Sequence, residues 1–223
     1  HKVTLVDLPG TYSLTTISEQ TSLDEQIACH YILSGDADLM INVVDASNLE
    51  RNLYLTLQLL ELGIPCIVAL NMLDIANIQN IHIDIPALSA RLGCPVIALV
   101  STRASGIKEL KAAIDQLPPA TAMERVVYHP ILQQEVDALA SDMPAEMALQ
   151  QRRWLALQIL EGDIYSQSHA GNAQQRLPEV KARLAAQQLD DPALLIADAR
   201  YQCIAALSAD ISNSHLTAPN KLT

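Results

Sequence analysis

The stretch PCIVALNMLD, residues 65–74, decides the fold, because an apolar strand runs directly into a polar N-x-x-D turn. Two further apolar runs end in the same way: Val3–Val6 leads into DLPG at residues 7–10, and Pro95–Val100 leads into STR at residues 101–103. Near-continuous apolar strands are typical of a parallel sheet covered by helices on both faces. Right-handed crossovers place the ends of such strands at one edge. We therefore expect the three polar corners to converge there.

The first half of the chain alternates strands with helices, which predicts an α/β fold. Strands are predicted at Val3–Val6, Leu39–Val44, Pro65–Leu70 and Pro95–Val100, and helices at Leu23–Leu33, Leu49–Leu62, Ile85–Leu92 and Ile107–Leu117. The helix at Leu49–Leu62 has the clearest pattern, with one apolar face and Gly63 as its stop signal. Asn42 is the one polar interruption of its strand.

The second half shows no alternation. Pro118 and Pro119 break the pattern, and helices are predicted at Ile131–Leu139, Glu146–Leu160, Leu177–Leu189 and Pro192–Leu207. This divides the chain into an α/β domain at residues 1–117, a linker at 118–129, a small all-helical domain at 130–211 and a flexible tail at 212–223. Trp154 is expected in the core of the helical domain. Glu161-Gly162-Asp163 is expected to be a helix end and turn that exposes its two acidic groups.

Composition excludes several classes of function. The formal charge of −11 argues against a nucleic-acid surface, which needs a basic patch, and against an anionic membrane surface. No apolar run approaches the ~18–20 residues that cross a bilayer, so we expect the chain itself to be soluble.

Thiols and imidazoles give no sign of a metal site. The four cysteines form no C-x-x-C pair and are expected to be reduced core thiols. His30 and His129 have no partners at metal-ligand spacing and are expected to be structural or exposed.

The N-x-x-D corner suits guanine. The carboxylate of Asp74 can accept from both N1–H and the 2-amino group, whereas adenine offers no such donor pair, and a site of this kind can discriminate by roughly 10⁴-fold. Asn71 can tie the base loop to its neighbours. Met72 stands where N-K-x-D motifs carry lysine, and its thioether can pack over the purine without supplying charge, which predicts guanine selectivity with modest affinity. A plain Asn/Asp turn is the alternative, which the other two corners disfavour.

The D-x-x-G corner suits the γ-phosphate. Asp7 can hold Mg²⁺ through a water, and the N–H of Gly10 can meet the phosphate because glycine permits close approach. Loss of that phosphate would release the following loop. Thr11 stands where Ras-like enzymes carry a water-orienting glutamine and is too short for that role, so slow hydrolysis is expected.

The third corner, Ser101-Thr102-Arg103, is similar to the S-A-K corner whose backbone N–H groups contact the guanine oxygen. A helix N-cap or serine/threonine turn is the alternative. No G-x-x-x-x-G-K-[ST] phosphate loop occurs in the 223 residues.

Three segments together resemble the bacterial ferrous iron transport protein B family: DLPGTYSL at residues 7–14, VVDASNLERNL at 43–53 and VALNMLD at 68–74, including the Met in place of Lys. Residues 125–210 are similar to the helical appendage of that family, which resembles a dissociation inhibitor favouring the GDP state. The resemblance implies a parallel-sheet P-loop-type GTPase domain, here without its P-loop and switch I, followed by a small all-helical domain. It implies GTP/GDP and Mg²⁺ as cofactors.

The resemblance also implies a role. The chain is expected to be a GTPase domain at the cytoplasmic face of the bacterial inner membrane, regulating Fe²⁺ uptake by a permease domain of the same polypeptide. A guanine-nucleotide sensor with incidental hydrolysis is the alternative. Small iron-transport proteins and a second copy of the chain are further partners compatible with the resemblance, and nucleic acid is not expected. No catalytic residue is assigned.

Overall fold

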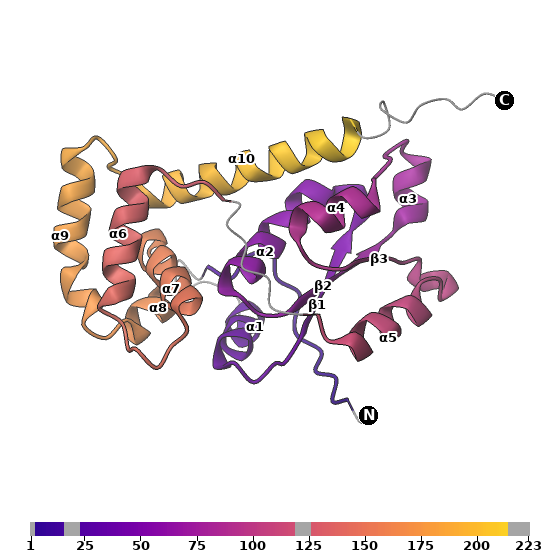
Figure 1. Cartoon of the computed structure of the whole chain (residues 1–223), viewed down its shortest axis with the longest axis horizontal. Helices are drawn as coiled ribbons and strands as arrows, with labels where there is room; N and C mark the ends of the chain where they lie inside the picture. The colour runs from indigo at the N-terminus through magenta and orange to yellow at the C-terminus, as the bar shows by residue number, and fades with distance from the viewer. Residues whose placement is uncertain (1–2, 16–22, 119–125, 214–223) are drawn as a thin grey trace. The chain divides into compact units, whose positions relative to one another are not determined.

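The computed structural model describes residues 3–15, 23–118 and 126–213. The chain divides into two units, one made of His1–Asp38 with His129–Ile196 and the other of Leu39–Tyr128 with Ala197–Thr223. The elements of both units are labelled in Figure 1. The predicted linker at 118–129 and tail at 212–223 lie largely outside the described residues.

A parallel sheet organises the second unit. Its strands are β1 (Met40–Asp45), β2 (Cys66–Asn71) and β3 (Val96–Ala98), in the order β1-β2-β3. Asp45 lies opposite Asn71 in the register of β1 and β2. The strand ends that carry the polar corners of this unit therefore share one edge. The parallel sheet with its helices confirms the predicted α/β class.

Helices of the second unit follow the strands. They are η1 (Ala46–Asn48), α2 (Leu49–Leu62), α3 (Leu73–Ile78), α4 (Ile85–Leu92), η2 (Ser101–Arg103) and α5 (Ile107–Gln116). α2 packs against β1 and β2, α4 against β3 and α5 against β2. Asn42, the polar interruption of β1, is buried and donates to Thr56 Oγ1 of α2 at 2.8 Å. A buried amide needs such a partner, and this one ties α2 to the sheet.

The predicted strand at Val3–Val6 is wrong. These residues are neither helix nor strand, and Val3 and Leu5 are 61% and 80% exposed. An apolar run shows that its residues favour burial, but a strand exists only where its backbone pairs with a neighbour. Within the described residues, β1, β2 and β3 pair only with one another.

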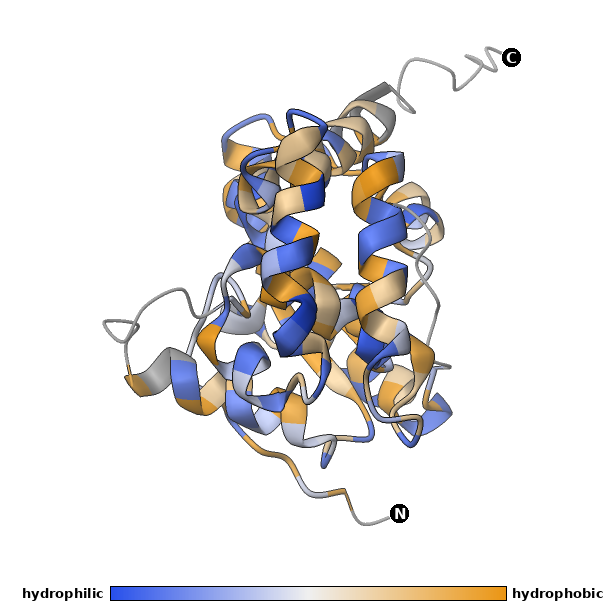
Figure 2. Cartoon of the chain, turned by 90° about the vertical axis from the view of Figure 1, so that its left-hand side faces the viewer, coloured by the Kyte–Doolittle hydropathy of each residue, from blue (hydrophilic) through white to orange (hydrophobic). Residues whose placement is uncertain are grey.

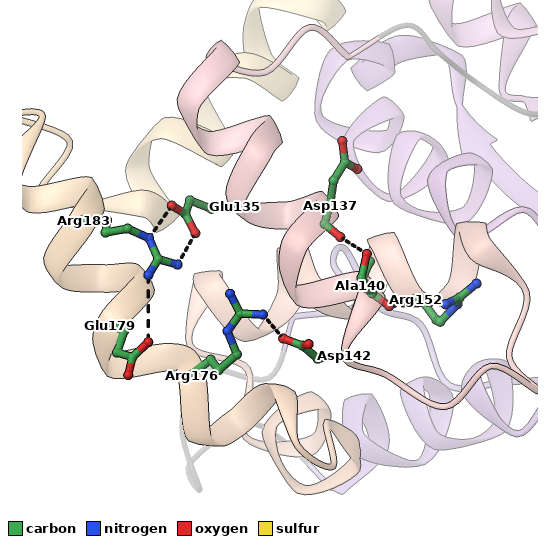
Figure 3. Close-up of polar contacts among 9 residues, drawn as sticks. Glu135, Asp137, Ala140, Asp142, Arg152, Arg176, Glu179 and Arg183 are labelled. Atoms are coloured by element: carbon green, nitrogen blue, oxygen red, sulfur yellow. Dashed lines mark hydrogen bonds and ion pairs between the residues drawn. The ribbon is translucent and has the colours of Figure 1, made fainter.

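The first unit is helical. It contains α1 (Leu23–Ser34), α6 (Pro130–Ser141), α7 (Leu149–Glu161), α8 (Ile164–His169) and α9 (Ala173–Ala186), and α10 (Pro192–Asn213) begins in it and continues into the second unit. Apolar and polar residues alternate along these helices (Figure 2). Trp154 is 1% exposed, which confirms its predicted place in the core. Ion pairs join the helices, as where Arg183 of α9 meets both carboxylate oxygens of Glu135 of α6 at 2.7 Å (Figure 3).

The turn at residues 161–163 forms as predicted, but its acidic groups are not exposed. Gly162 adopts a φ of 89° at the end of α7, and Asp163 caps α8 by accepting from Ser166 N–H at 2.6 Å. Glu161 and Asp163 are 8% and 1% exposed. The expectation of an acidic surface here is wrong, because the cap draws the Asp163 carboxylate into the bundle.

Two further sequence expectations concern thiols and membrane spans. Cys29, Cys66 and Cys94 are buried, and burial raises the pKa of the Cys66 thiol above its ordinary value. Cys203 is only half-buried, so the expectation of a core thiol is wrong there. In the part of the chain that the structure describes, none of the helices combines the length and the apolar character that crossing a membrane requires.

Candidate functional site: the carboxyl edge of the sheet

Asn71 and Ser101 form a reciprocal pair at the edge of the sheet. The Asn71 side chain donates through Nδ2 to Ser101 Oγ at 3.1 Å, and the Ser101 N–H donates to Asn71 Oδ1 at 3.1 Å. β2 ends at Asn71 and η2 begins at Ser101. The structure therefore brings two of the predicted site residues together and joins their loops.

Met72 and Asp74 follow directly on this edge. Met72 adopts the left-handed conformation, with a φ of 61°, and its side chain is 46% exposed. Asp74 lies half-buried in the first turn of α3, where no protein partner for its carboxylate is found among the described residues. Its oxygens are thus open to donors from a ligand. Ala76, fully buried, donates its N–H to Met72 O at 3.0 Å and fixes the turn.

The η2 loop is closed on itself. Val100 and Ser105 exchange two backbone hydrogen bonds of 3.2 and 3.3 Å, and Arg103 N–H donates to Val100 O at 2.9 Å. Gly106 has a φ of +84°, and a Cβ there would lie 1.9 Å from Ala98 O, so only glycine fits.

Within this loop, Ser101, Thr102 and Arg103 are exposed. The alternative of a side-chain N-cap for the helix at Ile107 is not seen, because Gly106 occupies the cap position of α5 and the Ser101 hydroxyl accepts from Asn71.

Asp45 belongs to this edge and was missed by the sequence analysis. It ends β1 opposite Asn71, and its carboxylate accepts from Ser47 N–H at 2.8 Å, Ser47 Oγ at 2.7 Å and Asn48 Nδ2 at 3.1 Å. Partial burial raises its pKa, but the bonds from Ser47 and Asn48 outweigh burial and lower the pKa below the ordinary aspartate value. An Asp after an apolar run and before Ala-Ser-Asn is a capping pattern that could have revealed it.

Asp7 and Gly10 belong to the first unit and are described apart from this edge. Both are exposed and lie in irregular backbone. The Thr11 hydroxyl that follows donates to Ser13 O at 2.6 Å and accepts from Ser13 N–H at 3.3 Å. An exposed carboxylate fits Mg²⁺, which usually keeps several waters and is commonly bound by one or two carboxylates together with phosphates.

The segment after Gly10 is anchored to helices of its own unit. Leu14 is 1% exposed and its carbonyl accepts from Cys29 Sγ of α1 at 3.6 Å. Thr15 Oγ1 donates to Gln158 Oε1 of α7 at 2.9 Å. Gln158 is fully buried and is a second residue that the sequence analysis missed, since a glutamine in a helix carries no local signal.

Comparison with known families decides the identity of the fold. Residues 1–114 match the model described as Ferrous iron transport protein B, and residues 128–212 match the model described as FeoB cytosolic helical domain. The chain belongs to the ferrous iron transport protein B family. It contains the G domain of the family, and its helical region belongs to the cytosolic part.

Relatives agree with this assignment. The Fe(2+) transporter FeoB of Escherichia coli (strain K12) is 69% identical over 223 residues, which are 100% of this chain and 29% of that protein. The chain thus spans less than a third of the length of the curated relatives it matches.

Solved structures of the family share the fold. The cytosolic domain of L. pneumophila FeoB superimposes with a TM-score of 0.78 at 33% identity, covering 91% of this chain and 77% of that one. mGMPPNP-bound NFeoB from S. thermophilus gives a TM-score of 0.79 at 29% identity, covering 92% and 78%.

Proposed function

We propose that this chain is the guanine-nucleotide-binding GTPase region of a ferrous iron transporter and that the β2–η2 edge holds the base. The observation that carries the proposal is the reciprocal hydrogen-bond pair between Asn71 and Ser101. It fixes two loops against each other beside the open Asp74 carboxylate. The guanine nucleotide bound to the related S. thermophilus protein supports the same ligand class.

Each residue of the edge has a role in base recognition. Asp74 accepts from guanine N1–H and the 2-amino group. Met72, exposed beside it, packs on the purine face through its thioether. In the η2 loop the Ser101 N–H is engaged by Asn71 Oδ1 and the Arg103 N–H by Val100 O, so the Thr102 N–H is the donor placed to meet the guanine oxygen.

The phosphate end is assigned to Asp7 and Gly10. Asp7 would hold Mg²⁺ through a water, and the ion neutralises charge on the phosphates when it is bound. The N–H of Gly10 approaches the γ-phosphate. Thr11 is too short to orient water, and its hydroxyl bonds to Ser13, so we expect slow hydrolysis. The short Thr11 side chain, already bonded to Ser13, favours the second candidate function, a nucleotide sensor in which hydrolysis is incidental.

The helical bundle supplies the regulatory contact. The segment after Gly10 is held by Leu14 in the core and by the Thr15–Gln158 hydrogen bond. A bundle that holds one conformation of this segment raises GDP affinity by binding linkage, by about 1–3 kcal/mol. Gln158→Leu should therefore speed GDP release, and an unchanged rate would reduce the bundle to a spacer.

In the whole protein, this region would regulate Fe²⁺ passage through a permease domain of the same polypeptide, at the cytoplasmic face of the inner membrane. The test of the nucleotide assignment is titration of the full-length protein with fluorescent GDP and ADP, for which we expect roughly 10⁴-fold tighter GDP binding. Equal affinities refute base recognition. If GTP and GDP leave Fe²⁺ uptake into proteoliposomes unchanged, the proposed regulation of uptake is refuted, while the nucleotide assignment stands.

A further inference from the structure

Arg200 is a buried charge to which the proposed function gives no role. It lies on α10 and is 0% exposed, although charged side chains are almost never fully buried unless paired. Its partner is Glu61 in the last turn of α2, whose side chain is 7% exposed. Arg200 Nε donates to Glu61 Oε2 at 3.1 Å, and Nη2 lies 3.1 Å from the same oxygen. Both residues belong to the second unit.

Two tyrosines complete the arrangement. Arg200 Nη1 donates to Tyr54 OH at 3.3 Å, and the guanidinium carbon lies 5.6 Å from the centroid of the Tyr54 ring. Tyr128 OH donates to Glu61 Oε1. We call Tyr54, Glu61, Tyr128 and Arg200 the Arg200 cluster. It joins α2, the residues before α6, and α10, which are far apart in the sequence.

A buried ion pair of this kind is poorly explained by stability alone. Desolvation of two charges offsets most of their attraction, and apolar residues of similar volume often stabilise equally well. What the pair specifies is position. The planar guanidinium fork fits one arrangement of acceptors, and a helix rotates about 100° per residue. A shift of α10 by one residue on α2 would therefore leave the buried Glu61 carboxylate without its cationic partner, with only the Tyr128 hydroxyl bonded to it.

The other end of α2 lies at the proposed base site. Asp45, opposite Asn71, holds Ser47 and Asn48 just before α2 begins, and α3 contacts η1. The Asn42–Thr56 hydrogen bond ties the middle of α2 to β1. α2 therefore runs from the base-binding edge to the Arg200 cluster with polar ties at both ends.

We propose that the Arg200 cluster is a positioning element that couples α10 to the nucleotide-binding edge through α2. A guanine nucleotide that orders the β2–η2 edge restrains η1 and α2, and the Glu61–Arg200 pair passes this restraint to α10. Because the first residues of α10, Pro192–Ile196, belong to the first unit, the restrained helix is shared by both units. The inference rests on the proposed function, since it needs nucleotide at this edge.

Hydrogen exchange in the full-length protein tests the coupling, with GDP as the probe. In the wild type, saturating GDP should slow amide exchange across residues 197–207 of α10 by about 5- to 150-fold, the range of typical allosteric couplings. The variant Glu61→Leu/Arg200→Met keeps apolar packing without the fork. It should fold and bind GDP while its α10 exchange no longer responds. Glu50→Gln, an exposed change on the same helix, is the matched control and should respond like the wild type.

The outcomes separate the two proposals. GDP binding without any change in α10 exchange in the wild type, or a full response in the double variant, overturns the coupling and leaves the nucleotide assignment standing. Failure of the wild type to bind GDP overturns both. Should the double variant not fold, Glu61→Gln, which keeps the shape of the side chain and removes its charge, must show a reduced response, and an undiminished one there also overturns the coupling.

Discussion

Replacing Asn71 by alanine removes both hydrogen bonds that join β2 to η2, each 3.1 Å long. Each such bond contributes about 0.5–1.5 kcal/mol net, so the loss of order in the base loops should cost about 1–3 kcal/mol of nucleotide binding. This corresponds to a roughly 5- to 150-fold rise in the Kd for GDP. Ser101→Ala removes only the Oγ acceptor and keeps the backbone N–H bond, so its cost should be about half that of Asn71→Ala in free energy.

The assay is displacement of fluorescent GDP from the full-length protein, with thermal unfolding measured alongside to show that each variant is folded. Asn77→Ala, an exposed change on the neighbouring α3, and Ser141→Ala, an exposed serine of α6, are the matched controls and should leave the Kd unchanged. A Kd for GDP of Asn71→Ala within twofold of the wild-type value would refute the reasoning that this pair organises the base site. A loss of GDP binding free energy in Ser101→Ala as large as that in Asn71→Ala would refute it too.

Two further predictions concern the loop and the bundle. Gly106→Ala should weaken GDP binding and lower the Tm, because its Cβ would lie 1.9 Å from Ala98 O at a φ of +84°; a variant that melts and binds like the wild type contradicts this. Hydrogen bonding from Arg183 holds the pKa of Glu135 below its ordinary value of 4.5. The stability that this pair contributes is therefore present above pH 4.5 and lost as the pH falls through the lower folded-state pKa. Glu135→Gln should be less stable than the wild type at pH 7, with the difference closing on acidification in pH-dependent melts, whereas Glu179→Gln, 3.9 Å from Arg183 and 72% exposed, should change little. A difference in stability between Glu135→Gln and the wild type that stays the same at every pH would contradict a stabilising role for the Glu135–Arg183 ion pair.

Much of the fold could be predicted because its helices carry a full apolar period. The helices at Leu49–Leu62 and Ile85–Leu92 have the predicted bounds. α3 and α8 were missed because each has six residues, too few for a period to show. The strand at Val3–Val6 was predicted wrongly because apolar residues report a preference for burial and not the presence of a pairing partner.

Some residues of the candidate site could be predicted from the sequence and others could not. Asn71, Asp74 and Ser101 follow apolar strands, so parallel topology predicts a shared edge for them, and the Asn71–Ser101 contact is what that edge contains. Gln158 acts through a hydrogen bond to Thr15, which only the folded chain places beside it, whereas Asp45 bonds to Ser47 and Asn48 close by in the sequence and carries a local capping pattern. The burial of Glu161 and Asp163 could not be predicted either, because the sequence of a charged turn does not distinguish carboxylates that face water from carboxylates that cap a helix.

The most direct measurement of the central claim is the affinity of Asp74→Asn for GDP and for xanthosine diphosphate. An asparagine at residue 74 opposes guanine donors with an amide donor and should weaken GDP binding by about 2–3 kcal/mol, roughly 30- to 150-fold. Xanthine carries a carbonyl where guanine carries its 2-amino group, so the variant amide can donate to it. If Asp74 reads guanine, Asp74→Asn prefers xanthosine diphosphate and the wild type prefers GDP. An unchanged preference for GDP in the variant would contradict the assignment of this edge as the base site.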